Sequence, residues 1–236
     1  MLKLIRVGLL SLLFCAPMLA EDKPANWSEQ QIAKLPKSET PIRLFNGKDL
    51  EGWDGQTAKY FKVDNGEIVA RNEIANAPKA STYLVTKKKY RNLRLIFESK
   101  LVESEMHSGI ALWGQTVEKE GDSFSYQGHL VMYPSGYGFW DLYRRNGIYQ
   151  DQDGAAKKVG HQHDWNQMEI VAVGSRIQFA LNGHAVADWT DPKPELCEAG
   201  PLGLQLHSNT VAQELRFRGL ILTENPEEKL VTVEAK

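Results

Sequence analysis

Apolar and polar residues alternate along short segments over most of the chain beyond residue 42. An apolar residue at every second position is the pattern of a β-strand that buries one face, because successive side chains of a strand point to opposite sides. About a dozen such segments occur, and no helical period longer than two turns is found among them. Three clear examples are Leu93, Leu95, Phe97 and Leu101, then Ile177, Phe179 and Leu181, and finally Leu215, Phe217 and Ile221. The pattern therefore predicts an all-β fold.

Asn-Gly dipeptides separate several of these segments. Asn65-Gly66, Asn146-Gly147 and Asn182-Gly183 each lie between two strand-like segments. Both residues of an Asn-Gly pair can adopt the positive φ that a tight two-residue hairpin needs, so the pairs predict antiparallel hairpins. Residues 41–224 are accordingly predicted to form one β-sandwich domain without an internal repeat, and the charged residues 225–236 to form a solvated tail.

The N-terminal 20 residues have the order of features found in an export signal. Two basic residues come first, an apolar stretch follows over residues 7–14, and a segment rich in small residues ends at Ala20. Residues 1–20 are therefore predicted to be a signal peptide, and the protein to be exported to the periplasm or the extracellular space. Lipid attachment at Cys15 is disfavoured, because the bulky Phe14 precedes it. A membrane anchor is disfavoured as well, since the apolar stretch is shorter than the ~20 residues that span a bilayer.

Residues 21–40 are polar and are predicted to form a leader that packs against the edge of the domain. A short helix is expected in this leader, in which Ser28 and Gln31 have the spacing of a capping box. Trp27 and Ile32 are the apolar residues expected to make the contact.

Composition and charge narrow the range of partners. The chain has 236 residues, with 28 Lys plus Arg against 30 Asp plus Glu and a formal net charge of −2. Because no dense Lys or Arg stripe occurs, a nucleic-acid partner is not expected. No apolar segment after the signal approaches ~20 residues, so no membrane span is predicted in the mature chain. Cys197 is the one cysteine beyond residue 20, so no internal disulfide is expected, and with no base beside it in the sequence it is interpreted as a packing cysteine.

The common catalytic signatures do not occur. The chain has no GxSxG, HExxH or CxxC motif and no Gly-rich phosphate loop. Glu103 and Glu105 are the one close carboxylate pair at a plausible strand end, and we interpret them as a solvated junction rather than a glycosidase pair. His161, His163 and Asp164 lie in a polar loop, where three ligands without a fourth are a weak indication of a metal site.

Polar and aromatic residues gather in four other strand-like segments, residues 105–114, 126–133, 138–145 and 200–207. In each of them apolar residues are expected on one face, and histidine, aspartate, glutamine or aromatic residues on the other. If the four strands share one sheet, these polar side chains converge on its outer side. Aromatic rings stack on the C–H faces of sugars, and planar polar groups bond the hydroxyls, so the mixture favours carbohydrate recognition. The predicted catalytic residues are His107, His129, Asp141 and His207, and the predicted substrate-binding residues are Trp113, Tyr126, Tyr143, Arg144 and Gln205.

Five blocks of the chain carry a resemblance to a known family. The first is Arg-Leu-Phe-Asn-Gly-Lys-Asp-Leu-Glu-Gly-Trp at residues 43–53, and the later ones are residues 108–110, 164–166, 181–183 with Asp188, and 200–207. In this order they resemble the 3-keto-disaccharide hydrolase domain family, long described as a domain of unknown function and also as family-16-like glycoside hydrolase. The resemblance covers residues 42–223. It implies a concanavalin-A-like jelly roll, a β-sandwich of two curved antiparallel sheets that is exported from bacteria and acts on oxidised glycosides.

The resemblance implies a 3-keto-glycoside or 3-keto-disaccharide as the substrate, and the chemistry of such a sugar suggests how its glycosidic bond is cleaved. The ketone at C3 acidifies the hydrogen at C2, so a base can remove it, an enolate forms, and the substituent at C1 leaves before water is added. Histidine, with an unperturbed pKa of ~6.5, suits the role of base. We expect His129 or His107 as the base, Asp141 as its orienting group or as the acid, Arg144 and Gln205 as polar clamps, and His207 as a third contributor. A divalent cation on the enolate is compatible with this chemistry, but no motif specifies one.

Two alternatives stay open on the sequence. Many family members have a Tyr-Glu-x-Gln strand where this chain has Gly-His-Leu-Val at residues 128–131, so a non-catalytic, lectin-like carbohydrate-binding module is one alternative. A structural or adhesion domain of the cell surface is the other. A titrating base distinguishes the enzyme, since a lectin needs stacking and hydroxyl contacts but no group that takes up a proton.

Overall fold

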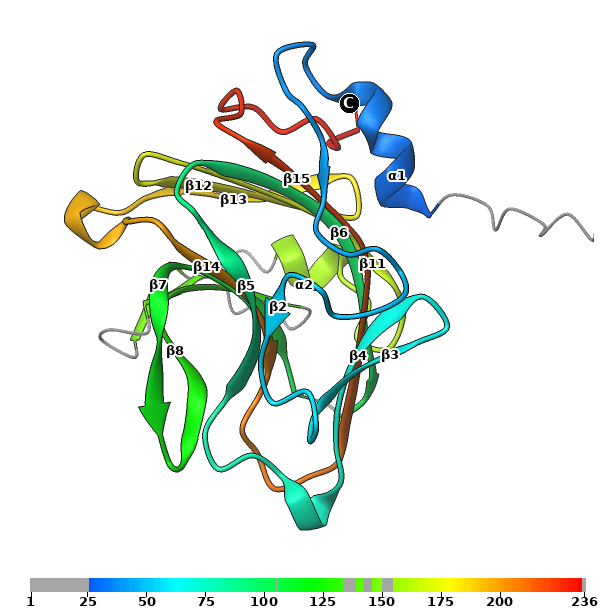
Figure 1. Ribbon diagram of the computed structural model, residues 1–236. Helices are drawn as coiled ribbons and strands as arrows, with labels where there is room; N and C mark the ends of the chain where they lie inside the picture. Colours follow the sequence, from blue (N-terminus) through cyan, green and yellow to red (C-terminus); the bar gives the residue numbers. More distant parts are fainter. Residues whose placement is uncertain (1–25, 105, 134–138, 142–145, 150–154, 235–236) are drawn as a thin grey trace, which may run out of the picture.

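Two curved antiparallel sheets pack face to face in the computed structural model (Figure 1). The structure describes residues 26–104, 106–133, 139–141, 146–149 and 155–234, with the segments 139–141 and 146–149 described by their backbone. The predicted all-β, concanavalin-A-like jelly roll is confirmed in this part of the chain. The predicted signal peptide at residues 1–20 lies outside the described residues.

One sheet has eight strands in the order β13, β12, β11, β6, β15, β4 and β3, and the short strand β1 also pairs with β15. The neighbouring strands in it are antiparallel. The strand bounds are β1 (Ile42–Arg43), β3 (Phe61–Asp64), β4 (Glu67–Asn72), β6 (Leu93–Glu103), β11 (Asn166–Val173), β12 (Arg176–Leu181), β13 (His184–Thr190) and β15 (Gln213–Glu224).

The other sheet has seven strands in the order β10, β9, β8, β7, β14, β5 and β2, again antiparallel. Four of them, β7, β8, β9 and β14, contain the segments in which polar and aromatic residues gather, so these segments share one sheet as the hypothesis required. The strand bounds are β2 (Trp53–Asp54), β5 (Thr82–Tyr90), β7 (Ser108–Lys119), β8 (Asp122–Tyr133), β9 (Phe139–Asp141), β10 (Asn146–Tyr149) and β14 (Gly200–Leu206).

The core between the two sheets follows the alternation of the sequence, with one correction in β15. Leu215 and Phe217 are buried in this core as predicted. The register of β15 then shifts between Arg218 and Ile221, where Gly219 has a φ of +60°. A bulge of this kind adds one residue to the strand and reverses which side chains face inward. The residues after it that enter the core are therefore Leu220 and Leu222, and the predicted inward placement of Ile221 is wrong.

Two of the three predicted Asn-Gly hairpin turns are confirmed. Asn65-Gly66 joins β3 to β4 with φ values of +53° and +82°, and Asn182-Gly183 joins β12 to β13 with +48° and +81°. The third prediction is wrong, because Asn146-Gly147 belongs to strand β10, where Gly147 pairs with Trp140 of β9.

The N-terminal leader packs on the outer face of the eight-stranded sheet through helix α1 (Trp27–Gln31), which contacts β15 and β6 (Figure 1). A short 3-10 helix, η1 (Ile32–Lys34), follows it. The predicted capping box is wrong, because no side chain caps α1 and the Ser28 hydroxyl donates instead to the buried carboxylate of Glu98, at 3.2 Å. The contact also differs in detail from the prediction, since Ser28 and Gln31 are buried whereas Trp27 and Ile32 are half-buried.

The C-terminal residues up to 234 differ from the predicted solvated tail in one respect, because several of their side chains are exposed but the segment is attached to the fold at Val231 and Thr232. The fully buried Arg94 of β6 pairs with Glu39 of the leader and with Glu169 of β11. The second oxygen of the Glu169 carboxylate accepts hydrogen bonds from the backbone N–H groups of Val231 and Thr232, at 2.9 and 2.8 Å. A buried carboxylate needs such donors, because it has lost its hydration. These hydrogen bonds hold the C-terminal segment against the sheet.

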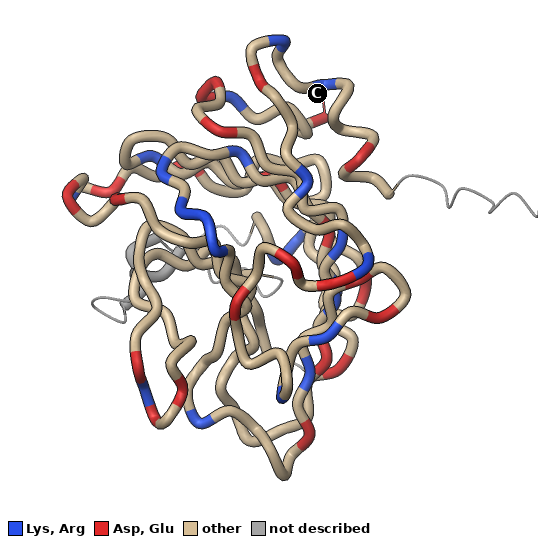
Figure 2. The backbone as a smooth tube through the Cα atoms, in the orientation of Figure 1, with Lys and Arg blue, Asp and Glu red and all other residues tan. Residues whose placement is uncertain are grey.

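Charged residues of both signs are interspersed over the strands and loops of the described part (Figure 2). None of the helices in that part is long and apolar enough to cross a membrane. Three further short helices lie in loops, η2 (Ile74–Asn76), α2 (Ala155–Val159) and η3 (Pro194–Leu196).

Candidate functional site

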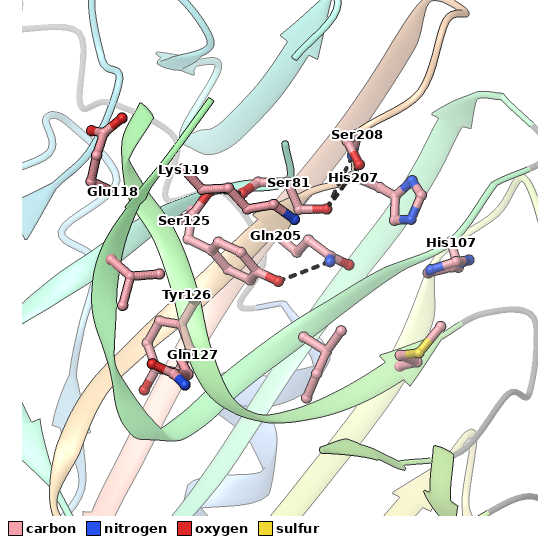
Figure 3. Close-up of a pocket in the computed structure, with 14 residues that line it drawn as sticks. Ser81, His107, Glu118, Lys119, Ser125, Tyr126, Gln127, Gln205, His207 and Ser208 are labelled. Atoms are coloured by element: carbon pink, nitrogen blue, oxygen red, sulfur yellow. Dashed lines mark hydrogen bonds between the residues drawn. The ribbon is translucent and has the colours of Figure 1, made fainter. Parts of the chain in front are cut away.

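A pocket of about 470 Å³ lies on the face of the seven-stranded sheet that points away from the core, over strands β5, β7, β8 and β14 (Figure 3). The alternation of β14 shows this directly, because Leu204 and Leu206 enter the core whereas Gln205 and His207 line the pocket. The volume lies in the range of roughly 300–1,000 Å³ that is usual for small-molecule sites. Its polar lining includes Ser81, Tyr83, His107, Lys119, Gln205, His207 and Ser208.

The register of the strands explains which side chains meet in the pocket. In β14 and β7, Gly203 pairs with Ala111 and Leu204 with Ile110, and the same register continued to the ends of both strands sets His207 opposite His107. Residues directly opposite on one face of an antiparallel pair lie close together. Two histidines that are 100 positions apart in the sequence therefore become neighbours.

The two imidazole rings are in contact, with their centroids 4.4 Å apart and their planes at 63°. Burial, and to a smaller extent the neighbouring His207, lowers the pKa of His107 to about 4. Burial also lowers the pKa of His207, against a hydrogen bond with the backbone of Ser208 that raises it. Both rings are therefore neutral near pH 7, and each can accept a proton from a ligand in the pocket.

Tyr83 and Gln205 form the centre of the pocket floor. They are direct partners in the β5–β14 pair, and the Gln205 Nε2 donates a hydrogen bond to the Tyr83 hydroxyl oxygen at 3.0 Å. The ring of Tyr83 also packs against that of Tyr126, with centroids 5.6 Å apart, and the Tyr126 hydroxyl donates to the carbonyl oxygen of Pro201 at 2.7 Å. Apolar Leu130 and Met132 complete the floor, which thus combines apolar surface with a few polar atoms.

Lys119 and Glu118 stand at the rim, at the end of β7. The amino group of Lys119 points into the pocket, whereas the carboxylate of Glu118 points away from it (Figure 3). Glu118 instead accepts hydrogen bonds from the Gly121 N–H at 2.9 Å and the Ser123 hydroxyl at 3.2 Å, both in the turn between β7 and β8 or just after it. Among the described residues that line the pocket, Lys119 is the only lysine or arginine.

Four of the predicted site residues, His107, Tyr126, Gln205 and His207, are brought together in this pocket. Their functional roles stay predictions. Tyr83, Lys119 and the serine pair Ser81 and Ser208 were missed by the sequence analysis.

His129 is on the opposite face of the sheet, and its predicted position on the outer face is wrong. Its ring is fully buried in the core, where Nε2 lies 2.6 Å from the carboxylate of Asp191. The alternation of this segment predicts Leu130 and Met132 in the core and His129 outside, but the two faces are exchanged, and Leu130 and Met132 form the apolar part of the pocket floor. His129 is therefore not available as a base to a ligand in the pocket.

Trp113 is also in the core rather than in the pocket, so its predicted placement is wrong. Its backbone has a φ of +53°, and the register between β7 and β8 shifts between Leu112 and Gln115. This bulge turns the indole to the same side as Leu112, where Nε1 donates to the carbonyl oxygen of Arg91 at 2.7 Å. The ring packs edge to face on His129, with centroids 5.3 Å apart.

The other predicted site residues are not fully described. Asp141 lies in β9 with its Cα opposite His129 of β8, and its side chain is outside the described part. Tyr143 and Arg144 lie outside the described residues, as does Glu105. Glu103, the other member of that carboxylate pair, is exposed at the end of β6.

One group of three metal-ligand atoms occurs among the described residues, from His129, Asp191 and Cys197, all within 4.8 Å of one another. The group is buried in the core, on the far side of the sheet from the pocket. The 2.6 Å between His129 Nε2 and Asp191 Oδ2 is a hydrogen-bond distance, shorter than the about 3.3 Å that separates two ligands of a tetrahedral zinc ion. Burial raises the pKa of the Cys197 thiol to about 12, which keeps it protonated. As placed, His129 and Asp191 are joined by a hydrogen bond, and the spacing of their two atoms is not that of metal ligands.

The histidines of the polar loop do not converge on a metal either. His161 Nδ1 lies 3.4 Å from the carbonyl oxygen of Trp165, and His163 Nδ1 lies 3.2 Å from that of Leu101. In the pocket, His107 and His207 are the imidazole ligands that the described residues offer, two fewer than the four of a usual zinc site. A cation there would need further ligands from solvent or substrate.

Comparisons with known proteins identify a family and other proteins with this fold. A family model described as "3-keto-alpha-glucoside-1,2-lyase-like domain" matches residues 40–222. Two crystal structures of candidate glycosyl hydrolases from Parabacteroides distasonis ATCC 8503 have the same fold. One has 18% sequence identity and a TM-score of 0.56, over 83% of this chain and 96% of the other. The second has 19% identity and a TM-score of 0.53, over 78% of this chain and 98% of the other. No curated protein matches the sequence.

Proposed function

This chain belongs to the 3-keto-alpha-glucoside-1,2-lyase-like domain family, and on that premise we propose that it cleaves the glycosidic bond of 3-keto-glycosides or 3-keto-disaccharides. Membership of this family shows that the protein is carbohydrate-active. The substrate and the reaction rest on the chemistry of the pocket.

The reaction begins with removal of the C2 proton by a neutral imidazole, for which His107 is the candidate and His207 its neighbour. The C–H electron pair moves toward the C3 carbonyl, whose oxygen becomes an enolate oxygen. The enolate then expels the C1 substituent, which leaves as an alcohol once it has taken up a proton, and a C1–C2 double bond remains. Water adds across this double bond in a later step and gives the free 3-keto sugar. The Lys119 ammonium is the cation available to the developing negative charge.

The observation that supports this reaction is the pair of neutral, contacting imidazoles in a pocket with one carboxylate. Glycosidases of the usual kind need two carboxyl groups on either side of the bond that is cleaved. Glu118 is the only carboxylate among the described residues that line the pocket, and it is engaged in the turn between β7 and β8. Proton abstraction next to a ketone needs one base and a site for the enolate oxygen, and the pocket offers both.

The test is release of 4-nitrophenol from 4-nitrophenyl 3-keto-glucoside, in its α and β forms, by the purified protein. Cleavage is expected with the ketone and not with the parent glucoside, and His107→Ala should reduce kcat by about 10²–10⁴, the usual contribution of a general base. No release from either ketone would contradict the proposal. Tight calorimetric binding of unoxidised glycans, together with no turnover, would favour a carbohydrate-binding module on the same sandwich.

We also propose that the protein is exported to the periplasm or the extracellular space, as residues 1–20 suggest. The mature protein recovered from the cell envelope or the medium should begin near Glu21, which N-terminal sequencing measures. Recovery of the full-length chain from the cytoplasm alone would contradict this.

A further inference from the structure

The hydrogen bond between Gln205 and Tyr83 leaves the Tyr83 proton without a partner among the described residues. The phenol oxygen accepts the bond from the Gln205 amide, so its own hydrogen points elsewhere. No described residue accepts that hydrogen. Burial raises the pKa of Tyr83 above its usual value, so the group stays protonated. Tyr83 is therefore a donor held in the pocket floor with nothing in the described part of the protein to donate to.

Gln205 supplies the complementary group. Its side-chain oxygen Oε1 is buried and has no hydrogen-bond partner among the described residues, and Gln205 as a whole is only 3% exposed. A buried polar atom without a partner costs free energy, so such atoms usually mark a place that a ligand or water fills. Oε1 and Nε2 belong to one amide group, and the unpaired acceptor is therefore adjacent to the unpaired donor of Tyr83.

We propose that Tyr83 and Gln205 together recognise a ketone next to a hydroxyl group, the α-hydroxy-ketone edge of an oxidised sugar. Tyr83 donates to the carbonyl oxygen, and the Gln205 oxygen accepts from the neighbouring hydroxyl. This rests on the proposed function and names the feature of the substrate that the pocket selects.

The pair distinguishes a ketone from an alcohol by the number of hydrogens that need a partner. A carbonyl oxygen is an acceptor only, so it is satisfied by the Tyr83 donor. A hydroxyl in the same place would bring a hydrogen of its own, which has no acceptor in this part of the floor because Gln205 is engaged by the adjacent group. A site built around such polar groups penalises a ligand that leaves one of them unpaired.

Tyr83 and Gln205 line the pocket of about 470 Å³, which provides the room for a sugar next to this pair. Gly109 continues the row of Tyr83 and Gln205 into β7, and the Leu130 side chain lies over it as part of the floor. A Cβ atom at this position would lie 2.7 Å from Leu130 Cδ1 and 2.8 Å from the Val131 carbonyl oxygen. The absence of a side chain at Gly109 therefore lets Leu130 pack closely on β7 and form the apolar part of the floor beside the Gln205 amide.

The experiment compares two ligands that cannot be cleaved, 1,5-anhydroglucitol and its 3-keto derivative, by isothermal titration calorimetry. Neither has a leaving group at C1, so binding is measured without turnover. The wild-type protein should bind the ketone about tenfold more tightly, the effect of one well-placed neutral hydrogen bond. Tyr83→Phe should bring the ratio of the two dissociation constants to about one. An unchanged ratio in this variant, or no preference for the ketone in the wild type, would overturn the inference.

Two further variants separate recognition from loss of folding. Tyr60→Phe makes the same chemical change at a residue that does not line this pocket, where the hydroxyl donates to the Asn76 carbonyl oxygen, and should leave the ratio unchanged. Gln205→Glu introduces a carboxylate that only accepts hydrogen bonds. The Tyr83 hydroxyl should then donate to this carboxylate instead of to the ligand, which abolishes the preference for the ketone although Tyr83 is still present. Retention of the tenfold preference by Gln205→Glu would also overturn the inference. Thermal unfolding of each variant reports whether the fold is intact.

The outcome is separable from that of the proposed function. A wild-type protein that prefers the ketone in this titration but releases no 4-nitrophenol would retain the inference and contradict the cleavage reaction. A protein that releases 4-nitrophenol, but whose Tyr83→Phe variant keeps the full preference, would retain the reaction and contradict the inference.

Discussion

Replacing His107 by glutamine should make the stability of the protein less dependent on pH between 7.5 and 5. In the folded protein, burial and then the neighbouring His207 lower the pKa of His107 from 6.5 to about 4. In the unfolded chain the imidazole regains its ordinary pKa of ~6.5. As the pH falls below this value, the unfolded chain takes up a proton that the folded protein does not. The free energy of unfolding must then decrease.

The magnitude follows from the two pKa values. Because the folded-state pKa is the lower one, the stabilising contribution is fully present above pH 6.5 and is lost as the pH falls toward 4. Between pH 7.5 and pH 5 the loss from this residue alone is roughly 2 kcal/mol, and the limit reached below pH 4 is roughly 3 kcal/mol. The variant keeps a polar side chain but cannot titrate, so it should lose about 2 kcal/mol less than the wild type over this range.

Urea unfolding followed by tryptophan fluorescence at both pH values measures the difference. His184→Gln in β13 is a matched control, because that ring is exposed in the folded protein as it is in the unfolded chain. The control should follow the wild type at both pH values. Equal losses of stability in the wild type and in His107→Gln would refute the reasoning, since they would show that the ring in the folded protein takes up its proton as readily as in the unfolded chain.

If His107 is the base, the acid limb of kcat/KM for a 3-keto-glucoside should have its midpoint near pH 4, and a midpoint at the ordinary histidine value would exclude this residue. Arg94→Met should lower the free energy of unfolding by about 3–5 kcal/mol in a urea titration, because Glu39 and Glu169 are left buried without their cation; a loss below about 1 kcal/mol would contradict the role of this contact in the docking of the C-terminal segment. Burial raises the pKa of Cys197 to about 12, so a protein without residues 1–20 should not react with Ellman's reagent at pH 8 until it is unfolded in urea. Rapid reaction of the native protein would show that this thiol is accessible.

The alternation of the sequence predicts the fold well because most strands keep one face toward the core. The same rule predicts that Gln205 and His207 face outward from β14, since no bulge interrupts that short strand between Gly203 and Leu206. It fails where a strand gains a residue. Trp113 has a left-handed backbone conformation and faces the core, and Gly219 shifts the inward position of β15 to Leu220. A strict alternation of apolar and polar residues predicts neither bulge.

Tyr83 illustrates a different limit of the sequence. It stands in the run Thr-Tyr-Leu-Val at residues 82–85, in which every residue is compatible with either face of a buried strand. Its role depends on Gln205, which is 122 positions away and becomes its partner through the register of β5 and β14. Pairing of this kind is set by the whole sheet, so it could not be deduced from either segment alone.

Leu130 and Met132 lie in the pocket floor and not in the core, and this placement bears on the protonation states of His107 and Tyr83. Both are apolar and buried, and the sandwich has a second, smaller apolar cluster on the outer face of the seven-stranded sheet, which they form with Tyr83, Ala111 and Tyr126. Burial is the largest cause of the lowered pKa of His107 and also of the raised pKa of Tyr83. The same low-polarity surroundings therefore keep the imidazole unprotonated and the phenol protonated, which are the states that a base and a hydrogen-bond donor need. An all-polar floor would bind hydroxyl groups equally well, but it would leave His107 titrating near its ordinary value and so charged over part of the acidic range.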